Sequence, residues 1–346
     1  MTTKLVPFDE DAIEEAKSLI LKGEVVGFPT ETVYGLGADA TNESAIRKIF
    51  AAKGRPGDNP LIVHISDLSE IGNVISGEMP ENAKKLADAC WPGPLTMIFP
   101  KGDKIPLCVT AGLDSVAVRF PNHSAAQALI RSCGVPIAAP SANLSGKPSP
   151  TTAMHVFRDM DGRIPLIIDG GSCEVGLEST VVDIRQSPVR VLRPGGITPK
   201  MIADILGEVE VDGSVLRPLK EGEVVRSPGM KYKHYAPNGS LVIVKGGETR
   251  VAEEIISLYD ETPGEKRILA LNDHLSLYGN RKVCPLGENA EEMARRLFDA
   301  LREMDEDNVT AIFSEAVEAE GIGLAVMNRL GRAAAFHIVN AGADEP

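Results

Sequence analysis

The chain of 346 residues is long enough for about two domains, and its 43% hydrophobic and 25% charged residues are ordinary for a soluble globular protein. Its net charge of −13 weighs against tight, non-specific binding to nucleic acid, because that affinity comes mostly from neutralising phosphates. The apolar runs fall far short of the roughly 20 residues that span a bilayer, and the N-terminus has no apolar signal core, so we expect a cytoplasmic protein. The five cysteines lie far apart without a C-x-x-C pair, so we expect neither a zinc ribbon nor a disulfide framework.

The first helix is predicted over residues 10–22, where apolar residues recur with helical spacing. The next stretch organises the rest of the chain. It begins with a short apolar strand at 25–28 and a loop rich in hydroxyls and glycine at 29–37, and it continues with a helix over 42–52. That helix ends in the turn KGRPGDNP at 53–60, which is too rich in Gly, Pro and Asn to continue it.

This turn holds Lys53, Arg55 and Asn59 in a fixed exit loop, which we expect to lie near the loop that carries Thr30 and Thr32. Hydroxyls, a cationic pair and backbone amides brought together suit a small anionic ligand, such as a nucleotide phosphate. From these residues alone, a solvated basic turn after an ordinary strand–loop–helix unit is an equal alternative.

Strands and helices then mix as far as Gly207, and some strands are adjacent, which favours an α/β or α+β mixed sheet over a regular βαβ repeat. Strands are predicted at 61–65, 95–99, 116–120, 135–139, 166–169, 178–183 and 189–195, and helices at 80–90, 123–132, 151–160 and 198–207. Polar residues recur at the ends of these strands, which is the argument for a binding site.

Residues 208–239 contain no convincing periodic element and are interpreted as a linker, although 227–237 carries tyrosines, a histidine and lysines that suggest docking. The tail alternates strands with helices, which predicts a small three-layer parallel sheet. Its strands are expected at 241–244, 268–271 and 310–313, and its helices at 249–260, 290–304 and 324–335. We therefore predict domains at 1–207 and 241–346, with a linker at 208–240 that covers the active site.

The chain lacks a Walker loop, a G-x-S-x-G elbow and an H-E-x-x-H helix, and its six histidines have no metal-ligand spacing. The polar residues that remain can bind and orient, but they include no evident nucleophile. A reaction driven by positioning and charge stabilisation fits them, and nucleotidyl transfer is the leading example. Structural alternatives stay open: His64 as a core residue, Arg119 and Arg193 in ion pairs, and Ser141 and Ser149 in turns.

Five stretches together resemble the YrdC-like domain of threonylcarbamoyl-AMP synthases. They are PTETVYGL at 29–36, KGRP at 53–56, NPL at 59–61, VRFP at 118–121 and PSANLSG at 140–146. Residues 227–237 and the tail are similar to the long, two-domain form of that family. The resemblance implies a twisted mixed sheet with a concave cavity, followed by a smaller Rossmann-like α/β domain.

The resemblance also implies an activity that condenses L-threonine, bicarbonate or CO2, and ATP into threonylcarbamoyl-AMP and pyrophosphate, with Mg²⁺ accompanying ATP. A transient partner, a tRNA threonylcarbamoyl transferase complex, then modifies the adenosine beside the anticodon. Threonine contacts are implied for Thr32, His64, Arg119, Ala139 (through its backbone) and Ser179. Nucleotide contacts are implied for Arg55, Asn59, Ser115, Ser141, Asn143, Ser149, Arg193, His234 and Tyr235. Lys53 and Arg55 are the implied catalytic residues, and no protein metal ligand is implied.

Tyr232, His234 and Tyr235 are hypothesised to fold over the cavity as a lid. Two other functions are weighed against the synthase. An RNA-binding module is disfavoured by the net charge and by an aromatic content of only 4%. Carbamoyl transfer from another donor is the weaker option.

Overall fold

The computed structural model describes residues 2–217 and 234–343, and the chain divides into two compact units. Among the described residues, the first unit comprises 2–145 and 149–215, and the second comprises 146–148, 216–217 and 234–343. None of the helices in these described ranges is long and apolar enough to cross a membrane. The predicted domain boundaries at residues 207 and 241 stay a prediction.

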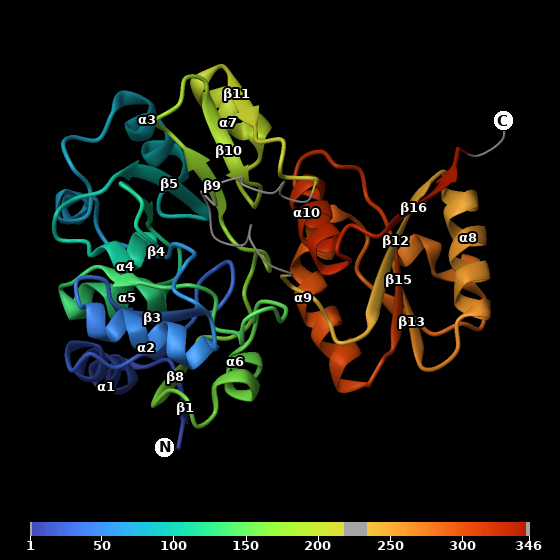
Figure 1. Ribbon diagram of the computed structural model, residues 1–346, viewed down its shortest axis with the longest axis horizontal. Coiled ribbons are helices and arrows are strands. Elements are labelled where there is room, and N and C mark those ends of the chain that lie inside the picture. The colour runs from blue at the N-terminus through green and yellow to red at the C-terminus, as the bar shows by residue number, and fades with distance from the viewer. Residues whose placement is uncertain (1, 218–233, 344–346) are drawn as a thin grey trace. The chain divides into compact units, whose positions relative to one another are not determined.

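The first unit is built on a mixed sheet with the strand order β1–β8–β2–β3–β7–β4–β6–β5–β9–β10–β11 (Figure 1). Its strands are β1 (Lys4–Pro7), β2 (Val26–Phe28), β3 (Gly35–Asp39), β4 (Ile62–His64), β5 (Leu95–Pro100), β6 (Ser115–Arg119), β7 (Ile137–Ala138), β8 (Leu166–Asp169), β9 (Thr180–Asp183), β10 (Val189–Arg193) and β11 (Val209–Val211). Strands β4 and β6 are parallel, whereas β5 and β6 are antiparallel, so the prediction of a mixed sheet is confirmed.

Helices of this unit begin and end where capping residues allow. They are α1 (Glu10–Leu21), α2 (Glu43–Lys53), α3 (Glu81–Cys90), α4 (Leu107–Thr110), α5 (Ser124–Cys133), α6 (Ala153–Met160) and α7 (Pro199–Leu206), with a 3₁₀ helix at Leu68–Asn73. The Asn42 side chain caps the start of α2, and Gly54 ends it in the left-handed region at φ 61°. Lys53 is therefore the last residue of α2, and the helix end fixes the position of its backbone.

The two faces of the central sheet have different roles. Val63, Met97 and Val118 are cross-strand partners and join the main core, which also includes residues of α2, α3 and α7. Side chains of successive strand residues point to opposite faces. Ile62 and Ala117 therefore lie on the other face, in a separate buried apolar cluster that we call the apolar floor: Ile62, Ile98, Ala117, Val181 and Leu192.

Several short elements differ from the sequence predictions. Strand β3 begins at Gly35, inside the stretch predicted as a loop, and pairs with β2. This pairing needs glycine, because a Cβ at Gly37 would come within 2.8 Å of the Phe28 ring. Strand β11 lies in the predicted linker, where its three residues pair with β10. Strand β1 and helix α4 were also not predicted, since runs of four residues have no measurable periodicity.

The second unit has an all-parallel sheet with the order β14–β13–β15–β12–β16. Its strands are β12 (Ser240–Gly246), β13 (Lys266–Ala270), β14 (Val283–Pro285), β15 (Ala311–Glu315) and β16 (Ile338–Gly342), and its helices are α8 (Glu248–Glu261), α9 (Ala290–Glu306) and α10 (Gly323–Ala333), with a 3₁₀ helix at Asn272–Tyr278. Helix α8 covers one face, and α9 and α10 cover the other (Figure 1). The predicted three-layer parallel sheet is confirmed, with β14 and β16 as unpredicted edge strands.

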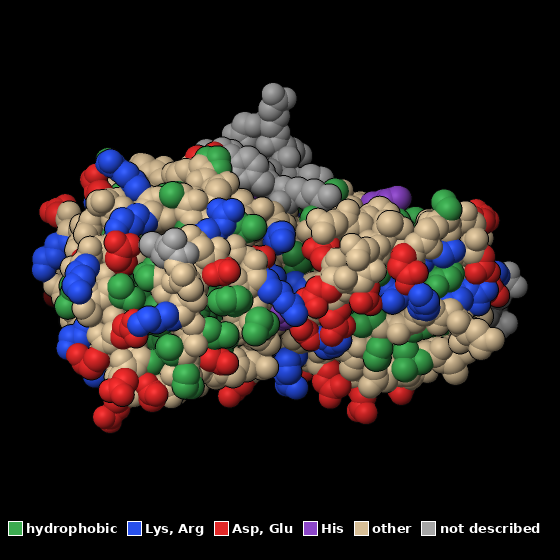
Figure 2. Space-filling view, turned by 90° about the horizontal axis from the view of Figure 1, so that it is seen from below, with side chains coloured by type: hydrophobic (Ala, Val, Ile, Leu, Met, Phe, Trp, Pro, Cys, Tyr) green, Lys and Arg blue, Asp and Glu red, His purple; other side chains and the backbone are tan. Residues whose placement is uncertain are grey.

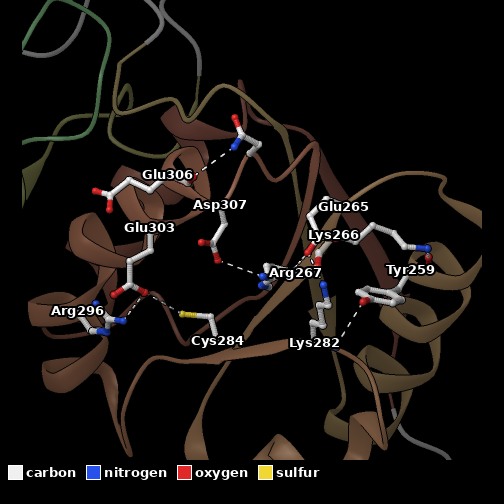
Figure 3. Close-up of polar contacts among 11 residues, drawn as sticks. Tyr259, Glu265, Lys266, Arg267, Lys282, Cys284, Arg296, Glu303, Glu306 and Asp307 are labelled. Carbon is white, nitrogen blue, oxygen red and sulfur yellow. Dashed lines mark hydrogen bonds and ion pairs between the residues drawn. The ribbon is translucent and has the colours of Figure 1, made fainter.

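Ion pairs join elements at the surface of this unit (Figure 3). Arg267 contacts Glu265 and lies 3.1 Å from Asp307, and the Glu265 carboxylate also accepts from Lys282 at 2.6 Å. Exposed pairs of this kind contribute little stability. Burial raises the pKa of the Cys284 thiol, which argues against a reactive thiolate. We therefore interpret this network as structural.

Candidate active site

The loops that carry the sequence motifs meet in the first unit. The Lys53 ammonium donates to the carbonyl oxygens of Ser141 and Asn143, the latter at 2.7 Å. Backbone hydrogen bonds of 2.9 Å join Ala142 N to Tyr34 O and Leu36 N to Pro140 O. The 29–36 loop, the end of α2 and the 140–146 loop therefore form one structure, as the sequence predicted for the exit turn.

A second group of polar residues lies where β4 and β6 end. His64 and Arg119 are register partners on these parallel strands, and Thr96 of β5 pairs with Arg119 from the other side. Cross-strand partners share a face of the sheet. His64, Thr96 and Arg119 therefore stand on the face of the apolar floor, opposite the main core.

Strands β9 and β10 add a third group. Arg193 donates to Ser179 twice, from Nε to the backbone oxygen at 3.0 Å and from Nη2 to Oγ at 3.1 Å. The Ser179 hydroxyl in turn lies 2.8 Å from Thr96 Oγ1. Ser179 is thus held between Arg193 and the strand next to Arg119.

Some buried polar atoms of the first unit have no hydrogen-bond partner within the described part of the chain. They include both amide atoms of Asn59, Nδ1 of His64, and both carboxylate oxygens of Glu31. Asn59 is fully buried. A buried polar group without a partner costs about 1–3 kcal/mol, so proteins rarely keep several of them together without a use. Their number here indicates a site prepared for a polar ligand.

The electrostatics of this face follow from burial. Burial, and then the charge of Arg119, lower the pKa of His64 to about 3, so its imidazole is neutral at pH 7. The Glu31 carboxylate lies 2.7 Å from Arg119 Nη2, and both side chains are 5% exposed. The face therefore carries one buried ion pair beside a neutral histidine.

The other predicted residues lie around these groups. Ala139 donates its N–H to Ile62 O at 2.9 Å, beside β4, and Ser115 begins β6 at the end opposite Arg119. Ser149 donates to Glu178 at 2.5 Å. Thr32 Oγ1 lies 2.9 Å from Thr30 Oγ1. The structure thus places these residues in the first unit, and their individual roles stay predictions.

His234 and Tyr235 belong to the second unit. The Tyr235 ring lies 5.1 Å from that of Phe298 on α9 and under the guanidinium of Arg329 on α10, at 5.8 Å. Tyr232, the third residue of the hypothesised lid, lies outside the described residues. Nucleotide contact by His234 and Tyr235 stays a prediction.

Comparison with known proteins identifies the family. Residues 18–195 match the family described as telomere recombination, and 197–335 match threonylcarbamoyl-AMP synthase, C-terminal domain. The chain is 46% identical to threonylcarbamoyl-AMP synthase of Pyrococcus abyssi over 96% of each chain. It is 47% identical to that of Bacillus subtilis, over 96% of this chain and 95% of the relative. The chain belongs to the threonylcarbamoyl-AMP synthase family.

Solved structures agree with this assignment. Pyrococcus abyssi Sua5 complexed with L-threonine is similar with a TM-score of 0.91 at 44% identity, covering 98% of this chain and 99% of that one. A variant of the same protein, H234A/Y235A, gives a TM-score of 0.92 at 43% identity, covering 99% and 100%. The predicted family and fold are confirmed. The chain is therefore an enzyme, a transferase that uses ATP.

Two residues in contact with the predicted site residues had no assigned role at the sequence level. Glu31 is the only charged residue in PTETVYGL, and Arg119 is the only one in its strand, so an ion pair between them could have been suggested. Thr96 gave no such signal, since a threonine in a strand is ordinary. Its place beside Ser179 depends on the pairing of β5 with β9, which residue spacing does not encode.

Proposed function

We propose that this enzyme makes threonylcarbamoyl-AMP from L-threonine, bicarbonate or CO2, and ATP, and releases pyrophosphate. The product supplies the threonylcarbamoyl group for modification of tRNA beside the anticodon, through a partner transferase complex. The observation that carries the proposal is the set of buried polar atoms in the first unit without a hydrogen-bond partner among the described residues, on Glu31, Asn59, His64 and Arg119, in a chain that belongs to this family.

On the amino-acid side, Arg119, Ser179, Thr32, Ala139 and the neutral His64 are the proposed threonine contacts. An arginine fork matches a carboxylate, and hydroxyls with a neutral imidazole suit the threonine hydroxyl. We propose that the threonine methyl group packs in a small apolar niche against the apolar floor. Such a niche supplies a preference for threonine over serine of roughly 1–3 kcal/mol.

On the nucleotide side, the proposed contacts are Arg55, Asn59, Ser115, Ser141, Asn143, Ser149 and Arg193, and His234 and Tyr235 are proposed as further contacts. The threonine amine, once it has lost its ammonium proton, adds to CO2 and releases a second proton to form a carbamate, or condenses with bicarbonate and releases water. A carbamate oxygen then attacks the α-phosphorus of ATP, and pyrophosphate leaves. Negative charge grows on the phosphate oxygens in this step, and Lys53 and Arg55 stabilise it. The scheme needs no protein nucleophile.

We propose that Mg²⁺ accompanies ATP. Mg²⁺ commonly keeps several waters and is held by substrate phosphates with one or two carboxylates. The residues present fit such a metal. Among the described residues, no group of three or more His, Cys, Asp and Glu forms a metal cage, but Glu178 offers a carboxylate beside the proposed nucleotide contact Ser149. The ion would neutralise phosphate charge alongside Lys53.

An RNA-binding module is the alternative. On the face drawn in Figure 2, Lys and Arg side chains are interspersed with Asp and Glu, with both signs spread over each unit. This mixture, with a net charge of −13, is unlike the clustered basic surface that neutralises RNA phosphates. Pyrophosphate release from ATP, assayed with threonine or bicarbonate left out in turn, separates the two functions. RNA affinity without that dependence would favour the alternative.

A further inference from the structure

Glu31 stands out because its charge is buried and its hydrogen bonds are incomplete. Its carboxylate lies 2.7 Å from Arg119 Nη2, and each side chain is 5% exposed. Yet neither Glu31 oxygen, nor Nε or Nη2 of Arg119, has a hydrogen-bond partner of good geometry within the described part of the chain. A buried ion pair is favourable only when further hydrogen bonds satisfy both partners. This pair is therefore poorly explained as a purely structural element.

The backbone aims this carboxylate at a fixed place. The Glu31 carbonyl accepts from Val175 N at 2.8 Å, and Thr30 Oγ1 accepts from the amides of Thr32 and Val33. Among the described residues, Arg119 is the cation within ion-pair distance of Glu31.

Charge balance then limits which ligand can use Arg119. A simple carboxylate bound to Arg119 would leave Glu31 as a second buried anion with no cation of its own, at a cost of several kcal/mol. A ligand that brings a cation together with its carboxylate avoids this cost. An α-amino acid carries both charges on one carbon, so it can insert between the two side chains and keep every charge paired.

We propose that Glu31 binds the α-ammonium of the amino-acid substrate while Arg119 binds its carboxylate. The pair then acts as a receptor for a zwitterion and rejects hydroxy acids of the same shape. The ligand forms hydrogen bonds with the Glu31 and Arg119 atoms that otherwise lack them. Only the identity of the bound amino acid, L-threonine, rests on the proposed function.

The test is binding of two probes to the full-length enzyme, measured by calorimetry. One probe is L-threonine, and the other is 2,3-dihydroxybutanoate, in which a hydroxyl replaces the ammonium. The wild type should prefer threonine by at least about 100-fold, because a buried charge is left unpaired by the other probe. Glu31→Gln should bind threonine at least about 30-fold more weakly and bind the hydroxy acid almost unchanged. The exposed Glu78→Gln, which removes one surface charge, should match the wild type.

A purely structural ion pair predicts a different pattern. Glu31→Gln would then weaken both probes and ATP alike, or change neither probe, and either result would overturn the proposal. So would a wild type that binds both probes equally well. If Glu31→Gln does not fold, Glu31→Asp keeps the charge but shortens its reach by one methylene. It should lose more affinity for threonine than for the hydroxy acid, and an equal loss would contradict the proposal.

The outcomes also separate this inference from the proposed function. If a different amino acid binds and supports pyrophosphate release, the proposed substrate is wrong, but the zwitterion receptor stands provided Glu31→Gln abolishes that preference. If threonine drives pyrophosphate release in both wild type and Glu31→Gln with equal KM, the function stands and the role of Glu31 is wrong.

Discussion

The Lys53 ammonium donates to the carbonyl oxygen of Asn143 at 2.7 Å, although the two residues are 90 positions apart in the chain. This contact, with the one to Ser141 O, fixes a buried cation between the end of α2 and the 140–146 loop. A cation held in place before the substrate arrives needs little reorganisation when negative charge develops. The contact links the two most specific sequence motifs of the chain.

Replacing Lys53 should therefore abolish most of the activity. We expect Lys53→Met to lower kcat for pyrophosphate release by about 10²–10³-fold, the range for loss of one preorganised electrostatic group. Lys48→Met is the matched control, because Lys48 lies on the same helix but pairs with Glu24 at 2.7 Å. Equal kcat values for Lys53→Met and the wild type would contradict the role given to Lys53.

Replacing Asn59 should weaken ATP binding without lowering the stability of the fold. Asn59→Ala removes a buried amide without a hydrogen-bond partner in the described structure, so the free energy of unfolding should change by less than about 1 kcal/mol or rise. ATP affinity should fall about tenfold or more, the loss of a hydrogen bond to a charged group. Urea unfolding and calorimetric ATP titration measure the two effects. A large loss of stability with unchanged ATP affinity would make Asn59 a structural residue.

His64 should make stability depend on pH. Its pKa is about 3 in the folded protein, against an ordinary value of 6.5, because of burial and then Arg119. The unfolded state therefore takes up a proton at pH values where the folded state does not. The stabilisation is fully present above pH 6.5 and is lost as the pH falls from there towards 3, by about 1 kcal/mol per pH unit.

Urea unfolding of the wild type and of His64→Gln at pH 7 and pH 5 tests this pH dependence. The variant should lose less stability between the two pH values than the wild type. His337→Gln, at an exposed position of the second unit, is the control and should behave like the wild type. Identical pH dependence in all three proteins would show that His64 titrates normally.

Glu315 should be a stability residue of the second unit. Its buried carboxylate accepts from Leu271 N at 3.1 Å and Tyr278 OH at 2.5 Å, and it lies 2.9 Å from His274 Nδ1. Glu315→Ala leaves these groups without their acceptor and should cost about 3 kcal/mol or more. Thermal unfolding followed by calorimetry measures the loss. The exposed Glu318→Ala should change the melting temperature little, and similar effects of both variants would refute the assignment.

The linker residues make a kinetic prediction. His234→Ala combined with Tyr235→Ala should raise hydrolysis of the adenylate or lower turnover, if these residues shield the bound intermediate. Adenylate and free AMP, separated by chromatography during turnover, report this directly. Tyr235→Phe is the control, since it retains the ring that packs against Phe298. Unchanged kinetics in the double variant would show that His234 and Tyr235 do not act as a lid.

Much of the fold follows from the sequence because its longer elements have clear periods and caps. Helix α2 runs from Glu43 to Lys53 between the capping residues Asn42 and Gly54, within a residue or two of the prediction. Strands β3 and β11 escaped because their pairing depends on a glycine fit and on three residues at a sheet edge. Short elements of this kind are decided by tertiary contacts rather than by local pattern.

The sequence singled out several residues that the structure brings together, but not how they are arranged. His64 and Arg119 stood out as polar residues in apolar strands, yet only the parallel pairing of β4 with β6 makes them neighbours. The ion pair of Glu31 with Arg119 depends on a loop fold that residue spacing cannot specify. Residue types thus indicated the chemistry, and strand order determined which groups meet.

The most direct test of the central claim is pyrophosphate release by the full-length enzyme from ATP, with L-threonine and bicarbonate each omitted in turn. Release is expected only when both are present, with threonylcarbamoyl-AMP formed in equal amount. Release that continues without threonine or without bicarbonate, or no release with all three, would contradict it.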